Sequence, residues 1–296
     1  MSPATPPLFA IDSPFPEANS TLRLLESPSS SPELLWDRLS NGTYDKPFIV
    51  DSGQRRFLHF DFETVQSAMH LPDPDKLCLA YTRKMMAFLL FNPSPERILV
   101  LGLGGGSLAK FCYRRLRCAV TAVEMNPDVI ALREEFGIPA DDSRFRVVHE
   151  DGSAYVVGLT SRKDVILMDA CDRTGIAPEF NTIEFYQSAR RCLSPGGVFV
   201  SNLCGDRKGR VAHLVKIRRV FGDQCMTLSV RWDGNVIVFA FKERARQIDW
   251  AHLEVTASTL THRLGLDFPK YVRRLALDRK LRDWQGVFNG DRVLSG

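Results

Sequence analysis

The sequence predicts an α/β protein: a doubly wound, mostly parallel sheet of seven strands, preceded by a small N-terminal β cap. Three observations support this prediction. Apolar strand-like runs alternate with helical segments from residue 97 to about residue 242, as in parallel sheets that are covered by helices. A glycine-rich turn follows the first of these strands, and acidic residues follow three later ones. Ligands of such sheets bind at the carboxyl ends of the strands, so we expect a functional site there.

The N-terminal segment, residues 1–43, differs in composition from the rest of the chain. Residues 1–32 hold seven of the 17 prolines and include the run Ser-Pro-Ser-Ser-Ser-Pro at 27–32. Such a composition does not sustain a continuous helix or strand ladder. We therefore expect this segment to be mobile, and we assign it no chemistry.

Residues 44–92 are expected to form the β cap and one helix. Short apolar segments flank residues 51–54, which have the composition of a hairpin turn. Apolar residues then recur with helical spacing from 77 to 91, and the Asn-Pro-Ser-Pro run at 92–95 ends that helix.

Residues 93–296 are expected to form the main domain. Its predicted strands are 97–101, 119–124, 145–149, 164–169, 197–202, 225–230 and 235–241, and its predicted helices are 107–116, 127–136, 182–193 and 208–220. The last two strands flank a turn-like segment, so we expect them to pair as an antiparallel hairpin at the sheet edge. Helical segments with basic faces follow residue 250.

Composition restricts the class of protein. The chain has 296 residues, 44% of them hydrophobic, which is enough for one large core. Its 39 basic and 35 acidic residues give a net charge of +4, which is too balanced to indicate a nucleic-acid partner. The N-terminus has no apolar signal segment, and no run approaches the roughly 18 apolar residues of a membrane span. We expect a cytoplasmic protein without a membrane partner.

The cysteines indicate a reduced protein without a metal. Seven cysteines are scattered along the chain, with no C-x-x-C pair. None has the Cys/His spacing of a zinc site. We therefore expect free thiols and no metal ligands.

The glycine-rich turn is the strongest sign of a ligand site. Its glycines are Gly102, Gly104, Gly105 and Gly106. Because these positions have no side chains, the backbone can approach a nucleotide-like ligand closely. About twenty residues after the first glycine, the next strand ends in Glu124, where the carboxylate of a dinucleotide-binding fold binds the ribose hydroxyls. Turn and acid together predict an adenosine site.

In these motifs and their order, residues 44–240 resemble the spermidine synthase (polyamine aminopropyltransferase) family and, more distantly, the class I methyltransferases. The resemblance implies a Rossmann-like sheet behind a β cap. It also implies transfer of an aminopropyl group from decarboxylated S-adenosylmethionine to a small amine such as putrescine. We expect a homodimer or a higher homo-oligomer.

The resemblance also assigns roles on the donor side and in catalysis. The family's glycine loop falls on residues 102–107, its ribose-binding glutamate on Glu124, and its adenine-side Asp-Gly pair on Asp151 and Gly152. Its catalytic Asp-Ser-Ser-Asp sequence falls on 169–172. Asp169 would then accept or orient the amine proton, and Asp172 would anchor the acceptor.

Three further positions of the family concern the pocket walls. Its cap glutamine falls on Gln66, its cap tyrosine more loosely on Tyr81, and its Phe-Tyr pair ends at Tyr186. These side chains would line the pocket, although a tyrosine on an apolar segment is more often a core residue. Cys171 takes the place of a family serine.

Two acids of the family are absent. The loop aspartate, which helps to hold the donor's ammonium, is Gly105, and the acid that follows the cap tyrosine is replaced near Arg83. A site for two cationic substrates needs a surplus of carboxylates. A methyltransferase that uses S-adenosylmethionine therefore stays an alternative, with Arg83 facing the methionine carboxylate. A non-catalytic adenosyl-binding protein is a second alternative, which the retention of Asp169 and Asp172 disfavours.

Overall fold

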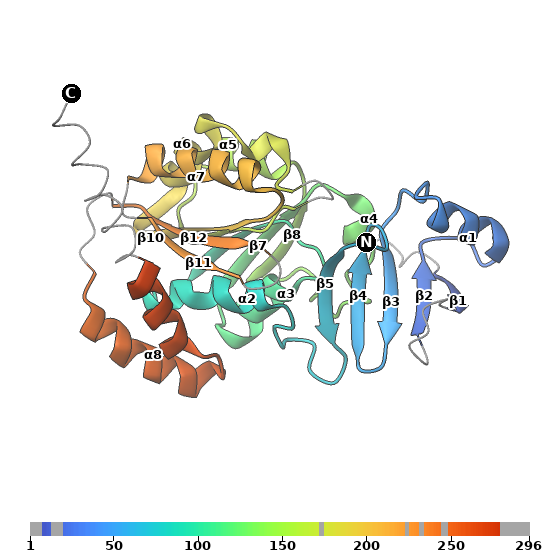
Figure 1. Ribbon diagram of the computed structural model, residues 1–296, viewed down its shortest axis with the longest axis horizontal. Coiled ribbons are helices and arrows are strands. Elements are labelled where there is room, and N and C mark those ends of the chain that lie inside the picture. Colours follow the sequence, from blue (N-terminus) through green and yellow to red (C-terminus); the bar gives the residue numbers. More distant parts are fainter. Residues whose placement is uncertain are drawn as a thin grey trace, which may run out of the picture.

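The computed structural model describes residues 8–12, 20–171, 175–222, 225–230, 234–243 and 248–278. These residues form two β-sheets, a smaller N-terminal one and a larger one that is covered by helices on both faces (Figure 1).

The N-terminal sheet is an antiparallel sheet of five strands that lie in chain order. They are β1 (Phe9–Asp12), β2 (Ser20–Leu24), β3 (Phe48–Ser52), β4 (Arg55–His59) and β5 (Val65–His70). The predicted hairpin is confirmed, because β3 pairs with β4 across a turn in which Gly53 has a φ of +55°.

This sheet begins earlier than the sequence predicted. β2 pairs with β3, and Leu22 and Leu24 are fully buried in a cluster that includes residues of α1 (Pro32–Ser40). β1 in turn pairs with β2, so the expectation that residues 1–43 stay outside the fold is wrong for 9–12, 20–24 and 32–40. Two leucines at alternate positions bury one face of the strand. The Ser31 hydroxyl caps α1 by accepting from the Leu34 amide, and proline is favourable in a first helical turn.

The larger sheet has seven strands in the order β11-β12-β10-β9-β6-β7-β8. They are β6 (Arg97–Leu101), β7 (Ala119–Glu124), β8 (Phe145–His149), β9 (Lys163–Met168), β10 (Leu193–Leu203), β11 (Met226–Ser229) and β12 (Val236–Phe241). All seven predicted strands are present. β11 and β12 form the predicted antiparallel hairpin, and β12 also pairs antiparallel with β10, whereas the remaining pairs are parallel.

Helices cover both faces of this sheet (Figure 1). One face carries α5 (Gly152–Gly158), α6 (Ile183–Cys192) and α7 (Arg207–Phe221). The other carries α2 (Ala80–Met85) with its continuation η1 (Met86–Leu90), α3 (Ser107–Lys110) with η2 (Phe111–Arg115), and α8 (Trp250–Leu264). The predicted helix 127–136 is shorter and forms only α4 (Pro127–Ala131), while α5 was not predicted.

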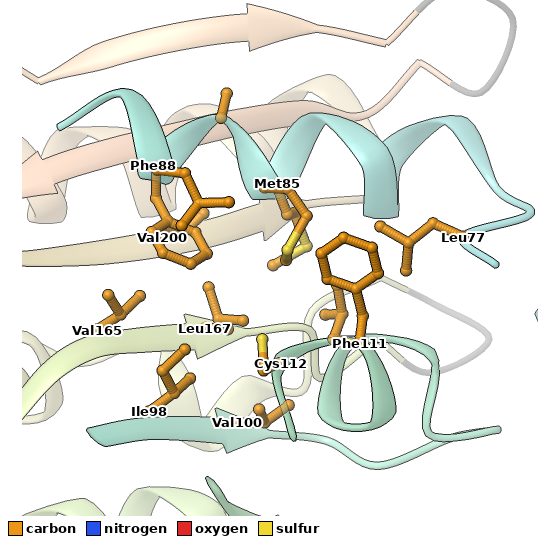
Figure 2. Close-up of a cluster of buried hydrophobic side chains, with 14 of the residues drawn as sticks. Leu77, Met85, Phe88, Ile98, Val100, Phe111, Cys112, Val165, Leu167 and Val200 are labelled. Atoms are coloured by element: carbon orange, nitrogen blue, oxygen red, sulfur yellow. The ribbon is translucent and has the colours of Figure 1, made fainter. Parts of the chain in front are cut away.

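The helix at 80–90 packs on the larger sheet, although its sequence position suggested the cap. Met85 and Phe88 lie over residues of the central strands, including Val165, Leu167 and Val200 (Figure 2). All five side chains are fully buried. The helix is therefore part of the layer that holds the sheet in place beneath the functional site.

The strand order reverses between β6 and β9. β7 and β8 follow β6 on one side, and β9 and β10 lie on the other. The crevice at the carboxyl ends of such a pair is the usual ligand site of this architecture. Gly102 and Asp169 lie there, and each is hydrogen-bonded to a neighbouring strand: the Gly102 amide donates to Val123 O on β7, and the Asp169 amide donates to Leu101 O on β6.

Candidate active site

The turn after β6 has to lack side chains at two positions. Gly102 has a φ of +88°, and a Cβ there would lie 2.3 Å from the backbone oxygen of Asp169. Gly106 has a φ of +70°, and a Cβ would lie 2.4 Å from Ile138 Cγ1. Both positions combine left-handed backbone with close packing, so only glycine fits. The turn is thereby held against β9, beside Asp169.

Gly105 packs inward, toward the cap. A Cβ there would lie 2.6 Å from Ser67 Oγ on β5 and 2.9 Å from Phe136 Cδ1. Of the four glycines that were expected to contact a ligand, Gly102 and Gly104 line the cavity described below, whereas Gly105 and Gly106 are buried behind it. The last two therefore support the turn, which corrects their expected role.

Glu124, at the end of β7, joins the glycine turn to the next loop. Its Oε2 accepts from the Leu103 amide at 2.9 Å, and its Oε1 accepts from the Asn126 amide at 2.9 Å. A carboxylate offers about four lone-pair sites, so each oxygen can accept one further bond. The side chain lines the cavity and can bind a vicinal diol there.

Asp151 and Gly152 start α5. Asp151 Oδ1 accepts from the Ala154 amide at 2.7 Å and caps the helix. Gly152 lines the cavity, and a Cβ there would lie 2.9 Å from the Phe180 ring. The absence of a side chain at 152 leaves room for Phe180 beside the cavity.

Asp169 lies directly after β9 and is partly buried in the wall of a cavity. Its Oδ1 accepts from Asn202 Nδ2 at 2.8 Å, and Tyr81 also hydrogen-bonds to it. Burial raises the pKa of the Asp169 carboxyl, and the two hydrogen bonds oppose that shift because they favour the charged form. The result is a carboxylate held in one orientation, with raised basicity, at the edge of a cavity.

The cavity has a volume of about 1020 Å³ and lies between the two sheets. The cap contributes Gln66 and Ser67 from β5, and the larger sheet contributes the glycine turn, Glu124 and Asp169. This size is at the upper end for small-molecule sites, and it suits a ligand larger than adenosine alone.

The charges around this cavity have one sign. Four carboxylates line it, those of Glu63, Glu124, Asp169 and Glu179, while no lysine, arginine or histidine from the described residues does. Opposite charges attract most strongly where water is displaced. The cavity therefore favours cations.

The sequence and the fold both match known proteins. Residues 78–206 match the family model of the spermine/spermidine synthase domain. A polyamine aminopropyltransferase of Chromobacterium violaceum is 40% identical over 229 residues, which cover 77% of this chain and 88% of that protein. This chain belongs to the spermine/spermidine synthase family.

Two solved structures share the fold. A probable spermidine synthase from Corynebacterium glutamicum superposes with a TM-score of 0.60 at 22% identity, covering 74% of this chain and 84% of that one. Human methyltransferase-like protein 13, solved in complex with SAH, gives a TM-score of 0.58 at 26% identity, covering 64% and 93%. The expected fold class, a methyltransferase-like sheet behind a β cap, is confirmed.

Arg83 and Tyr186 do not line the cavity of this family member, which corrects two expectations. Arg83 Nη1 donates to Leu77 O at 2.8 Å and to Cys78 O at 2.5 Å, so the guanidinium closes the turn before α2. The Tyr186 hydroxyl lies 2.6 Å from His213 Nδ1 on α7 and is fully buried. Burial raises the pKa of Tyr186 and lowers that of His213 to about 4. Tyr186 is therefore a core residue.

The expectation of free thiols is wrong at one place. Cys171 and Cys204 form a disulfide, with their Cα atoms 6.6 Å apart. The two cysteines are 33 positions apart in the sequence, and no short sequence motif predicted that they would pair. Asp172, the expected anchor of the acceptor, lies outside the described residues.

Sequence reasoning missed several residues of the site. Asn202, Ser67, Cys204, Glu63 and Glu179 all line the cavity. Asn202 follows an apolar strand run on β10, and this position at the carboxyl end of a strand is the signal that could have identified it. The part of the chain that the structure describes contains no group of three or more potential metal ligands and no helix able to cross a bilayer.

Proposed function

We propose that this protein transfers an aminopropyl group from decarboxylated S-adenosylmethionine to a small diamine such as putrescine. The observation that carries the proposal is the charge of the cavity, which four carboxylates line without a basic side chain among the described residues. Both substrates of such a reaction are cations. Membership of the spermine/spermidine synthase family gives the same reaction class.

The donor's adenosyl part fits the glycine-turn side of the cavity. Gly102 and Gly104 allow close approach of the backbone, and the free lone pairs of Glu124 can accept from the ribose hydroxyls. Gly152 leaves space for the base beside Phe180, and Asp151 is proposed to hold its edge. Gln66 contributes from the cap.

The acceptor's reacting nitrogen is proposed to lie at Asp169. In the reaction the nitrogen lone pair attacks the methylene carbon that is bonded to the sulfonium. The carbon–sulfur bond breaks, its electron pair goes to sulfur, and methylthioadenosine leaves. The amine must lose a proton, which Asp169 accepts or directs as a general base, while Tyr81 and Asn202 fix the orientation of the carboxylate.

Arg83 no longer supports methyl transfer from intact S-adenosylmethionine. Its guanidinium binds the carbonyls of Leu77 and Cys78, and it does not line the cavity. A donor that retains its carboxylate would place that negative charge among Glu63, Glu124, Asp169 and Glu179, which costs free energy in a cavity. The decarboxylated donor avoids this repulsion.

The test is a direct comparison of donors. We expect the purified protein to convert decarboxylated S-adenosylmethionine and putrescine to methylthioadenosine and spermidine, as measured by mass spectrometry. With intact S-adenosylmethionine we expect neither methylated nor aminoalkylated amine. Methylation of an amine without any aminopropyl transfer would overturn the proposal, and a series of diamines of different length would identify the preferred acceptor.

A further inference from the structure

A covalent bond joins the carboxyl ends of β9 and β10 beside the catalytic cavity. Cys171 lies two residues beyond Asp169, and Cys204 lies two residues beyond Asn202. β9 and β10 run parallel in register, with Met168 opposite Ser201. Two cross-links therefore join the ends of these strands: the hydrogen bond between Asp169 and Asn202, and the disulfide two residues further along each segment.

The disulfide touches the same amide that orients Asp169. Asn202 Nδ2 lies 2.8 Å from Asp169 Oδ1 and 3.9 Å from Cys171 Sγ. An antiparallel bridge joins Gly175 to Gly205, the residue after Cys204. A Cβ on Gly175 would lie 3.3 Å from the Gly205 Cα, so the two backbones are in close contact. This contact still holds the segments after β9 and β10 together when the covalent bond is broken, but it restricts their relative movement less than the disulfide does.

The two bonded sulfurs are the ones that a small reductant can reach through the cavity. Cys171 and Cys204 are half-buried and line the cavity. Four of the five free cysteines, Cys112, Cys118, Cys192 and Cys225, are buried. Burial raises the pKa of the Cys118 thiol to about 12 and that of the Cys112 thiol well above its ordinary value, so neither supplies a thiolate for exchange near neutral pH.

We propose that Cys171 and Cys204 form a redox site in the wall of the catalytic cavity, and that a dithiol reductant slows amine transfer by opening it. In the exchange the reductant supplies two electrons and two protons. The sulfur–sulfur bond breaks, both cysteines become thiols, and the dithiol closes to its own disulfide. The end of β10, with Asn202, then loses its covalent attachment to the end of β9, with Asp169.

Reduction of the disulfide should impair the reaction with the amine acceptor and leave binding of the adenosyl donor unchanged. The adenosyl contacts come from the turn after β6 and from Glu124 on β7, neither of which is bonded to the disulfide. The amine, by contrast, depends on the orientation of Asp169. This kinetic consequence rests on the function proposed above, whereas the redox chemistry of the pair does not.

The first measurement is the thiol count. The protein is equilibrated with reduced or with oxidised dithiothreitol, denatured, alkylated and analysed by mass spectrometry. We expect seven alkylated cysteines in the reduced sample and five in the oxidised sample, with Cys171 and Cys204 protected. Alkylation of both residues in the presence of excess oxidised dithiothreitol would overturn the proposal.

The second measurement is kinetic. On reduction we expect kcat/KM for the amine to fall about tenfold, less than the roughly 10²-fold cost of a 1 Å misplacement of a catalytic group. The Kd of methylthioadenosine should change by less than about twofold, because its contacts are elsewhere. C171S and C204S should each behave like the reduced protein in either buffer. C78S, which removes the partly exposed free thiol outside the cavity, should keep the full redox response.

Equal kinetics of the oxidised and reduced wild type would contradict the proposal without reference to any variant. A third readout is independent of activity. Hydrogen exchange of the amides of residues 203–206 should become faster on reduction, while that of β7 should not change. If no amine accepts an aminopropyl group in either buffer, the proposed function fails, and the thiol count and the amide exchange still decide whether the redox site exists.

Discussion

At the scale of single residues, the proposed adenosine site depends on Glu124. Its two oxygens accept from the amides of Leu103 and Asn126. In Glu124→Gln one oxygen becomes an amino group that faces a backbone N–H, and the charge is lost. We expect the Kd of methylthioadenosine to rise by about five- to thirtyfold, or roughly 1–2 kcal/mol. Isothermal titration calorimetry measures this change.

The matched control is Glu150→Gln, since Glu150 is an exposed acid on the next strand end and does not line the cavity. It should bind methylthioadenosine like the wild type. A folded Glu124→Gln variant with unchanged affinity would remove Glu124 from the ligand site.

Asp169 is the proposed general base, so turnover should depend on it. Asp169→Asn keeps the acceptor for Asn202 but removes the base, so kcat should fall about 10²–10⁴-fold, while methylthioadenosine binding stays intact. Because burial raises the pKa of Asp169, the wild-type rate should begin to fall on acidification at a higher pH than an ordinary aspartate would give. Steady-state kinetics over a pH series tests both statements, and full activity of the variant with any amine would exclude Asp169 as the base.

The same burial makes Asp169 unfavourable for stability. Its raised pKa means that the folded state disfavours the charged carboxylate. This acid therefore lowers stability as pH rises from the ordinary value of 3.8 through the raised one. We expect Asp169→Asn to unfold at a higher temperature than the wild type at pH 7, with a smaller difference at pH 4. A lower melting temperature at pH 7 would show that the ionised group stabilises the fold.

At the scale of elements, the N-terminal strand β2 is part of the cap. Leu22 is fully buried, so Leu22→Ala should lower the free energy of unfolding by about 2–5 kcal/mol. Leu34 on α1 is 61% exposed, and Leu34→Ala should change it by no more than about 0.5 kcal/mol. Urea denaturation distinguishes the two. Equal effects of the two substitutions would show that β2 adds nothing to the cap.

The elements of the larger sheet could be predicted because their apolar runs are long and separated by clear turns. β1, β2 and α5 were missed for different reasons. β1 and β2 are short and lie among prolines, and β2 pairs with β3, which follows more than 20 residues later, so this pairing is invisible to local patterns. α5 is rich in glycine and valine, which are weak helix formers. The family resemblance placed Tyr186 in the pocket wall, whereas the commoner alternative for a tyrosine on an apolar segment, a core residue, is the one found here.

The same limit applies to the site. Glu124 and Asp169 were identified because strand ends of one sheet edge meet in space. Asn202 and Ser67 reach the cavity only through the pairing of β10 with β9 and the packing of the cap on the glycine turn. The Cys171–Cys204 bond likewise depends on strand order. Contacts between distant segments have no signature in a single sequence.

At the scale of the whole molecule, one buried lysine makes the free energy of unfolding depend on pH in the alkaline range. Lys110 is fully buried between the glycine turn and the cap, and its Nζ donates to Phe136 O at 2.5 Å. Burial lowers the pKa of Lys110 from 10.5 to about 8. Between these values the unfolded chain binds more protons than the folded one, so stability rises with pH. The full gain is about 3 kcal/mol.

Lys110→Met should remove this alkaline gain in stability. The free energy of unfolding, measured in urea at pH 7 and at about pH 10, should rise with pH in the wild type and in the control Lys208→Met, which replaces an exposed lysine of α7. In Lys110→Met it should rise less. Parallel profiles for all three proteins would show that Lys110 is charged in the folded state throughout.

The packing at Gly105 limits how this loop can change during evolution. Any side chain at 105 meets Ser67 Oγ and the Phe136 ring, which belong to two other segments of the chain. An acid fits there only after one of those neighbours becomes smaller, and each such step alone leaves a gap or a clash. Substitutions at 105 are therefore coupled to those at 67 and 136, and position 105 is confined to glycine as long as Ser67 and Phe136 are present.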